Sequence, residues 1–160
     1  MIRIELKPSE YSMAVYLSSV REYVNKMSGV SDRQMGRDDG FKIGVDGLVA
    51  EFAVCKHFNV MPDLSFEPRG GGYDCIINGR KVDVKSTKVD RWDVFIPARK
   101  KTNNIDRYIW CWVDYRIAYI LGWFLPDDIF NDENLQQSPR VSEYHYAINL
   151  KQLRKVPGAK

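Results

Sequence analysis

The dipeptide Asn78-Gly79, between two short β-type segments, is the strongest local folding signal in this sequence. A two-residue type I′ turn needs positive φ at both central positions, and Asn followed by Gly adopts that backbone at low cost. On either side, residues 73–77 and 80–85 are rich in β-forming residues, with apolar residues at alternate positions. The sequence therefore predicts an antiparallel hairpin, and the fold must supply a sheet that contains it.

The register of this hairpin brings two carboxylates together. With a two-residue loop, Ile77 pairs with Arg80, and counting outward places Asp74 opposite Asp83. Opposite residues have Cβ atoms about 4.5–5.5 Å apart, where like charges destabilise the pair. Protonation of one acid, a basic neighbour or a bound cation would each offset this repulsion. A hairpin that needed only stability would seldom carry such a pair.

Alternation along the second strand adds an amine to the two acids. Lys85 and Thr87 fall on the same face as Asp83, whereas Val82 and Val84 fall on the other face. We therefore expect one face to build core and the other to hold acid, acid and amine.

The remaining elements predict a mixed α/β fold, with a sheet in the middle flanked by helices. Behind Pro8, helical spacing of apolar residues predicts a helix that ends near Gly29, with its apolar face in the core: Met13, Leu17, Val20, Val24 and Met27. Residues 45–53 mark a second helix that ends before Pro62. Further strands are expected over 92–96, 108–113, 117–125 and 144–148, with a short helix beginning at Pro126.

Composition excludes several classes of protein. The longest nearly continuous apolar run, residues 117–125, falls far short of the roughly 18 residues that span a bilayer, so we expect a soluble protein without a membrane partner. Charges interleave with apolar residues over 1–7, so no secretory signal is visible. Three cysteines without a C-x-x-C, and two histidines, argue against a disulfide framework or zinc finger. A reducing, cytoplasmic setting is expected.

The net charge of +3 hides an uneven distribution. Residues 80–107 carry nine basic and four acidic residues, a local balance of +5, whereas no other segment has a positive excess. A polyanion such as nucleic acid is a fitting partner for this window. A solvated basic loop is the alternative when nothing else supports binding.

A third carboxylate is placed by helical geometry. Gly44, Gly47, Glu51 and Cys55 form one stripe at the flank of the second helix's apolar arc. Taken alone, Glu51 is more often a solvated helix residue, and Lys85 more often a strand lysine with a packed stem. Combined with the opposed aspartates inside a basic window, these residues favour a functional site.

At these positions the sequence resembles the PD-(D/E)XK nuclease superfamily. The matching segments are the helical Gly47-Leu48-Val49-Ala50-Glu51, the strand dipeptide Tyr73-Asp74, and Val82-Asp83-Val84-Lys85-Ser86-Thr87 on the next strand. The resemblance covers about residues 44–88. It departs at Tyr73, where the family name implies Pro, and Asp83 in place of the commoner Glu lies within the pattern.

The resemblance implies a restriction-endonuclease-like core and assigns roles to five residues. Asp74 and Asp83, with the Val84 carbonyl, would bind Mg²⁺, for which Mn²⁺ would substitute. Glu51 would be an additional ligand, direct or through water, and Lys85 would orient the attacking water or stabilise charge on the phosphate. The choice between one and two metal ions stays open. Five basic residues of the window would then neutralise phosphates: Lys88, Arg91, Arg99, Lys100 and Lys101.

We therefore expect a single nuclease-like domain over residues 1–160, with an N-terminal helix and loop (1–40), a catalytic core (41–125) and a C-terminal helix and strand (126–160). The expected activity is metal-dependent endonucleolytic hydrolysis of DNA, directed at branched or junction structures, as in small phage or prokaryotic enzymes. Many members of the superfamily are homodimers, and the aromatic strands over 108–125 would supply such an interface. The aromatic side chains themselves are expected in the sheet core, with a base-stacking platform for nucleic acid as the alternative: Tyr108, Trp110, Trp112, Tyr115, Tyr119 and Trp123. The alternatives are a non-catalytic nucleic-acid-binding module and a protein-interaction domain. RNA as substrate and exonuclease action stay open.

Overall fold

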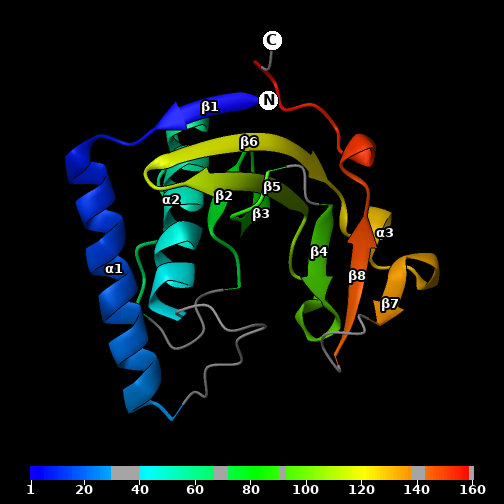
Figure 1. The fold of residues 1–160 in the computed structure, drawn as a ribbon, viewed down its shortest axis with the longest axis horizontal. Helices are drawn as coiled ribbons and strands as arrows, with labels where there is room; N and C mark the ends of the chain where they lie inside the picture. Colours follow the sequence, from blue (N-terminus) through cyan, green and yellow to red (C-terminus); the bar gives the residue numbers. More distant parts are fainter. Residues whose placement is uncertain (30–39, 67–71, 91–92, 138–142, 159–160) are drawn as a thin grey trace.

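The main sheet of the molecule has five strands and carries the predicted hairpin at one edge (Figure 1). The protein is described by a computed structural model that covers residues 1–29, 40–66, 72–90, 93–137 and 143–158. In spatial order the strands are β1 (Ile2–Glu5), β6 (Ile117–Phe124), β5 (Arg107–Asp114), β3 (Arg80–Thr87) and β2 (Cys75–Ile77).

Strands β3 and β5 run parallel, and the other neighbours in this sheet are antiparallel. The predicted mixed α/β class is confirmed. β1 is not among the predicted strands, because a four-residue edge strand carries too few alternating positions to stand out.

The hairpin has the predicted register. Ile77 pairs with Arg80 and Cys75 with Val82, and the turn residues Asn78 and Gly79 have φ values of 50° and 74°. Along β3, Val82 and Val84 are buried, whereas Asp83 and Lys85 lie on the other, partly exposed face. The core-facing and acid-bearing faces are therefore those that alternation predicts.

α2 (Gly40–Phe58) packs against the main sheet, and α1 (Pro8–Met27) packs on the outer side of α2 (Figure 1). The Lys7 backbone N–H donates to the Glu10 carboxylate at 2.6 Å, which caps α1. α2 supplies most of the helical core, and α1 contributes Ala14, Leu17 and Ser18.

The prediction that the apolar face of α1 lies in the core is wrong for most of its length. Leu17 is buried, whereas Met13 and Met27 are exposed, because α1 meets α2 through Ala14, Leu17 and Ser18. Helical periodicity identifies apolar positions on one side of a helix, and it does not tell whether the molecule covers them.

A second sheet lies against the opposite face of β5 and β6. Its strands, in spatial order, are β4 (Val94–Pro97), β8 (Tyr144–Ile148) and β7 (Leu135–Gln137), and the short helix α3 (Pro126–Ile129) follows β6. β7 is not among the predicted strands, whereas the strand at 144–148 and the helix at Pro126 are confirmed.

The aromatic residues on β5, on β6 and in the turn between them differ in burial. Tyr108 and Trp110 are buried in the core between the two sheets, with the Tyr108 ring stacked on Phe124 at 5.2 Å. Tyr115 lies in the turn between the strands and is exposed, so it builds no sheet core. Among the described residues, no helix has the length and apolar character to cross a membrane.

Candidate active site

Strand β3 brings Asp83 and Lys85 together on its partly exposed face. The Lys85 ammonium donates a hydrogen bond to the Asp83 carboxylate. It also lies 5.9 Å from the centroid of the Tyr108 ring on β5, within reach of a cation–π interaction. Asp83 and Lys85 thus form an ion pair on this face of the sheet.

Asp74 lies just before β2, and its backbone is hydrogen-bonded to two other segments of the chain. Its N–H donates to the Val82 carbonyl at 2.9 Å, and its own carbonyl accepts from the Asp63 N–H at 2.8 Å. Its carboxylate accepts from the Val84 N–H at 2.6 Å. Burial, followed by the neighbouring Asp83 charge, raises the pKa of Asp74 to about 7. The carboxyl groups of the two aspartates therefore lie close together. The regular pairing of β2 with β3 ends at Cys75 and Val82, and the Asp74 N–H bonds to Val82 and not to a residue opposite Asp83.

Glu51 joins this pair from α2 and is buried more deeply than a flank position suggests. Burial and the negative charge of Asp74 raise its pKa well above the ordinary value, while Arg21 and Lys85 act in the opposite direction. The structure therefore gathers Glu51, Asp74, Asp83 and Lys85 into one site. Of the three ways to offset acid repulsion, a basic neighbour is present in Lys85, and the raised pKa values of Glu51 and Asp74 favour their protonated forms.

Arg21 is a site residue that the sequence interpretation missed. Its guanidinium reaches from α1 to three groups: Glu51 Oε2 at 3.5 Å, the Asp63 carbonyl at 2.8 Å and the Ser65 carbonyl at 3.3 Å. Because the Asp63 N–H in turn holds Asp74, Arg21 braces both the helix that carries Glu51 and the segment that leads to Asp74. The available signal was its position four residues after Leu17, on the face of α1 that is actually buried.

Two thiols lie behind the acids and tie α2 to β2. Cys55, one turn after Glu51, shares a hydrogen bond with Cys75, the residue after Asp74. This contact and burial raise the pKa of Cys55, whereas the same contact lowers the pKa of Cys75. The pair fixes the spacing of the two elements that carry acids.

Two of the five basic residues predicted to contact phosphate already lie near carboxylates. Arg99 donates to Glu143 at 2.7 Å, and Lys88 lies 3.9 Å from Asp46, so phosphate would compete with a carboxylate at both. Lys101 is exposed and lies 3.5 Å from the Phe130 carbonyl. The nearby Lys85 charge, with burial, lowers the pKa of Lys100, which associates it with the site. Arg91 lies outside the described residues.

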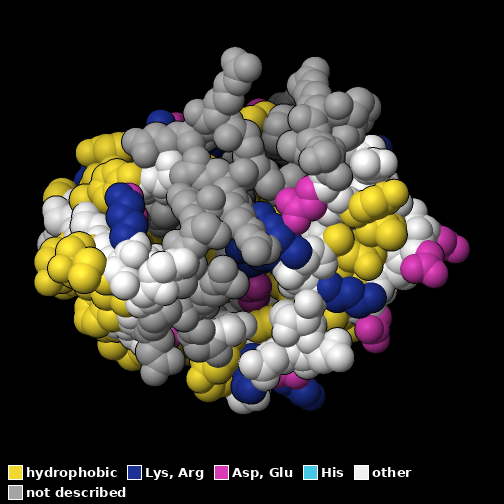
Figure 2. Space-filling view, turned by 90° about the horizontal axis from the view of Figure 1, so that it is seen from below, with side chains coloured by type: hydrophobic (Ala, Val, Ile, Leu, Met, Phe, Trp, Pro, Cys, Tyr) yellow, Lys and Arg dark blue, Asp and Glu magenta, His cyan; other side chains and the backbone are white. Residues whose placement is uncertain are grey.

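Charged side chains of both signs meet near the centre of the face shown in Figure 2. On this face, Lys and Arg side chains lie close to Asp and Glu side chains instead of forming a separate basic surface.

The donor chemistry of the site fits a hard divalent cation. Buried carboxylates of Glu51 and Asp74, with pKa values raised by burial and by neighbouring acids, beside Asp83, are oxygen ligands that such a cation would stabilise in their charged form. Within the described residues, however, no group of three or more Asp, Glu, His or Cys side chains is already arranged around one metal position. The side chains are of the chemical type that binds such an ion. In this structure Asp83 pairs with the Lys85 ammonium.

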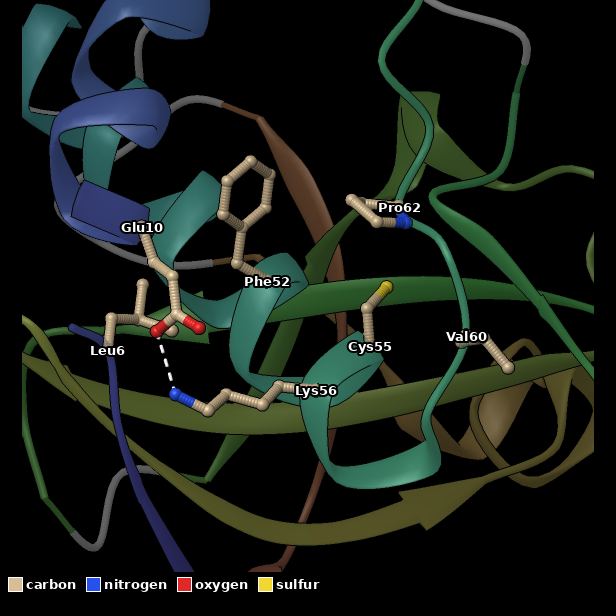
Figure 3. Close-up of a pocket in the computed structure, with 7 residues that line it drawn as sticks. All are labelled: Leu6, Glu10, Phe52, Cys55, Lys56, Val60 and Pro62. Carbon is tan, nitrogen blue, oxygen red and sulfur yellow. Dashed lines mark hydrogen bonds and ion pairs between the residues drawn. The ribbon is translucent and has the colours of Figure 1, made fainter.

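A separate small cavity lies beside Cys55 (Figure 3). Its volume is about 220 Å³. Its two charged lining residues pair with each other, since the Lys56 ammonium donates to the Glu10 carboxylate at 2.7 Å. Four of its seven lining residues are apolar or Pro around that pair: Leu6, Phe52, Val60 and Pro62. None of the four predicted catalytic residues lines it.

Comparison with known proteins gave no match to this chain among family models, curated proteins or solved structures.

Proposed function

We propose that this protein is a metal-dependent nuclease that hydrolyses phosphodiester bonds in DNA. The observation that carries the proposal is the convergence of Glu51, Asp74, Asp83 and Lys85 from three segments of the chain onto one partly buried site. Buried acids that raise one another's pKa values are costly to keep, and they are characteristic of functional sites.

The arrangement of elements supports the same proposal. A helix with Glu51 packs on an antiparallel hairpin with Asp74 and Asp83, and β3 then pairs in parallel with β5. This order is compatible with the restriction-endonuclease-like core that the sequence resemblance implies.

The chain's own residues would do three things. Asp74, Asp83 and Glu51 would hold Mg²⁺ or Mn²⁺, and a cation bound there stabilises the negative charge that develops on a phosphoryl group. Lys85, released from Asp83 when the acids bind a cation, would donate to the attacking water or to a phosphate oxygen. Arg21 would keep Glu51 oriented, and Lys100 and Lys101 would attract the DNA backbone.

One observation favours a second function. Lys85 neutralises Asp83, and the buried acids have pKa values raised toward protonation, so the site balances its charge without a cation. A non-catalytic nucleic-acid-binding module would have that property.

A cleavage panel separates the two. Purified protein is incubated with supercoiled plasmid, linear duplex, single strands and a four-way junction, in Mg²⁺, Mn²⁺ or EDTA. We expect nicking or cutting only with a divalent ion, and preference for branched DNA. Tight DNA binding without cleavage of any form, in either metal, would select the binding module. A matching RNA set tests the substrate class.

A further inference from the structure

The outer face of α1 carries an apolar stripe that the described part of the molecule leaves uncovered. Its members recur at steps of three, four, three and four along the helix: Met13, Tyr16, Val20, Tyr23 and Met27. Four of them are largely exposed, at 52%, 62%, 65% and 71% for Met13, Tyr16, Tyr23 and Met27. Figure 2 places hydrophobic side chains at the left edge of the molecule, where α1 lies in Figure 1. Hereafter these five residues are the α1 stripe.

The spacing is that of a helix that packs against another helix. Alternating steps of three and four repeat every seven residues, and they produce a straight seam when two helices cross at about 20°. α1 has 20 residues, so the stripe runs most of its length. A scattered set of exposed apolar residues needs no explanation, whereas a continuous seam of this kind indicates a partner.

The order of side chains identifies the partner as a second copy of this chain. Read in either direction, the α1 stripe is Met, Tyr, Val, Tyr, Met. A two-fold axis through Val20 therefore brings Met13 onto Met27 of the second copy and Tyr16 beside Tyr23, as an isologous interface requires. The nearby charged pair, Glu22 and Lys26, is joined within α1 at 2.7 Å, so it brings no net charge to the contact.

The area is sufficient for a weak dimer. Taking about 200 Å² for each fully exposed side chain, the four exposed residues can bury at most roughly 500 Å² per copy, or roughly 1,000 Å² in the pair. Specific interfaces begin at about this total. We propose that the protein forms an antiparallel homodimer through the α1 stripe, with a dissociation constant in the micromolar range.

The test is sedimentation equilibrium of the unmodified full chain and of three variants. Concentrations run up to about 100 µM, well above a micromolar dissociation constant. Tyr16→Glu and Tyr23→Lys each place a charge in the seam and should weaken self-association at least tenfold. Tyr144→Glu introduces a charge at an exposed tyrosine on β8, outside the α1 stripe, and should dimerise like the unmodified protein.

Mixing the variants tests the register. In the antiparallel arrangement, position 16 of one copy meets position 23 of the other, so the introduced carboxylate and the introduced amine attract each other. Equimolar Y16E and Y23K should therefore form a heterodimer. In a parallel arrangement these positions do not meet, and the mixture stays monomeric. Circular dichroism checks that each variant keeps its helices.

Three results would overturn the proposal: a monomeric unmodified protein across the whole concentration range, undiminished dimerisation of Y16E and Y23K, or failure of the mixture to associate. The readout is molecular mass, so the outcome is independent of whether the protein cleaves DNA.

Discussion

Asp74 is the residue at which stability and function are most clearly opposed. Burial and the Asp83 charge raise its pKa to about 7, so the folded protein keeps a proton there that the unfolded chain releases near its ordinary value of 3.8. Between these pH values the folded state binds more protons, and stability falls as the pH rises. Above about pH 7 the molecule holds a buried Asp74 charge, which Lys85 and the Val84 N–H offset in part.

Asp74→Asn should therefore stabilise the metal-free protein at pH 8. Asn keeps an oxygen for the Val84 N–H and removes the charge. We expect a gain on the order of 3 kcal/mol at pH 8 that shrinks toward zero near pH 4, measured by urea unfolding at several pH values.

The control for this prediction is Asp114→Asn, the same change at an exposed position at the end of β5. It should shift stability by less than about 0.5 kcal/mol at either pH. A loss of stability in Asp74→Asn at pH 8 would contradict the raised pKa.

Divalent ions should reverse this pH trend if the acids hold them. At pH 8, Mn²⁺ or Mg²⁺ should raise the melting temperature of the unmodified protein. Near pH 4, where protons compete for Glu51 and Asp74, the shift should vanish. Asp74→Asn should lose most of the shift at pH 8. Equal metal-induced shifts in the unmodified protein and Asp74→Asn would place the metal elsewhere.

Residues that the hairpin positions could be predicted from the sequence, whereas those positioned by packing could not. Asp74, Asp83 and Lys85 follow from turn chemistry and a period of two, which are local. Arg21 depends on how α1 rotates against α2, with 30 residues separating it from Glu51. No local pattern contains that rotation, because it is decided by which small residues of α1 fit against α2.

At the scale of elements, the sequence predicts those helices, strands and turns that their own residues favour strongly. The Asn78-Gly79 turn, the second helix and the long strands β5 and β6 were all predicted. The short strands β1 and β7 were not, since edge pairing is supplied by β6 and β8 rather than by their own residues. Met13 and Met27 of the α1 stripe were assigned to the core, because periodicity is the same for a core face and for an uncovered seam.

Two glycines give an element-level test of packing. Gly122 lies on β6 beneath the C-terminal segment, and a Cβ there would lie 2.6 Å from Leu153 Cβ and 2.9 Å from the Arg154 carbonyl oxygen. Gly122→Ala should therefore destabilise the protein by about 1–3 kcal/mol, because the backbone of the C-terminal segment must shift.

The matched change is Gly47→Ala on α2, where a Cβ meets no atom within 4 Å. It should stabilise the protein by about 0.5–1 kcal/mol through helix propensity. Urea unfolding measures both, and equal effects of the two substitutions would contradict the described packing of residues 153–154 on β6.

At the scale of the whole molecule, the basic window of residues 80–107 is partly neutralised before any ligand arrives. Arg99 and Lys88 already lie near carboxylates, and Lys100 lies close enough to the site to feel the Lys85 charge. The local +5 therefore overstates the charge that would face DNA, and we expect both a modest affinity and a modest dependence of that affinity on salt.

Lys101 offers the clearest test of this electrostatic surface. Each phosphate contact contributes about −0.9 to the slope of log affinity against log salt, so Lys101→Ala should reduce the slope by about one and weaken binding to all sequences alike. Lys151→Ala removes an exposed lysine outside the window and should leave the slope unchanged. Fluorescence anisotropy over a salt series measures both.

Cleavage, on the proposed function, resides in the acids and the amine gathered around β3. The most direct test is single-turnover cleavage of the preferred DNA by Asp83→Asn and Lys85→Ala, beside the matched controls Asp114→Asn and Lys151→Ala. We predict that the two site variants lose at least about 10³-fold in rate, because charge stabilisation at the phosphoryl group is removed, while DNA affinity stays within about threefold. Cleavage by Asp83→Asn and Lys85→Ala at the rate of their controls would contradict the account.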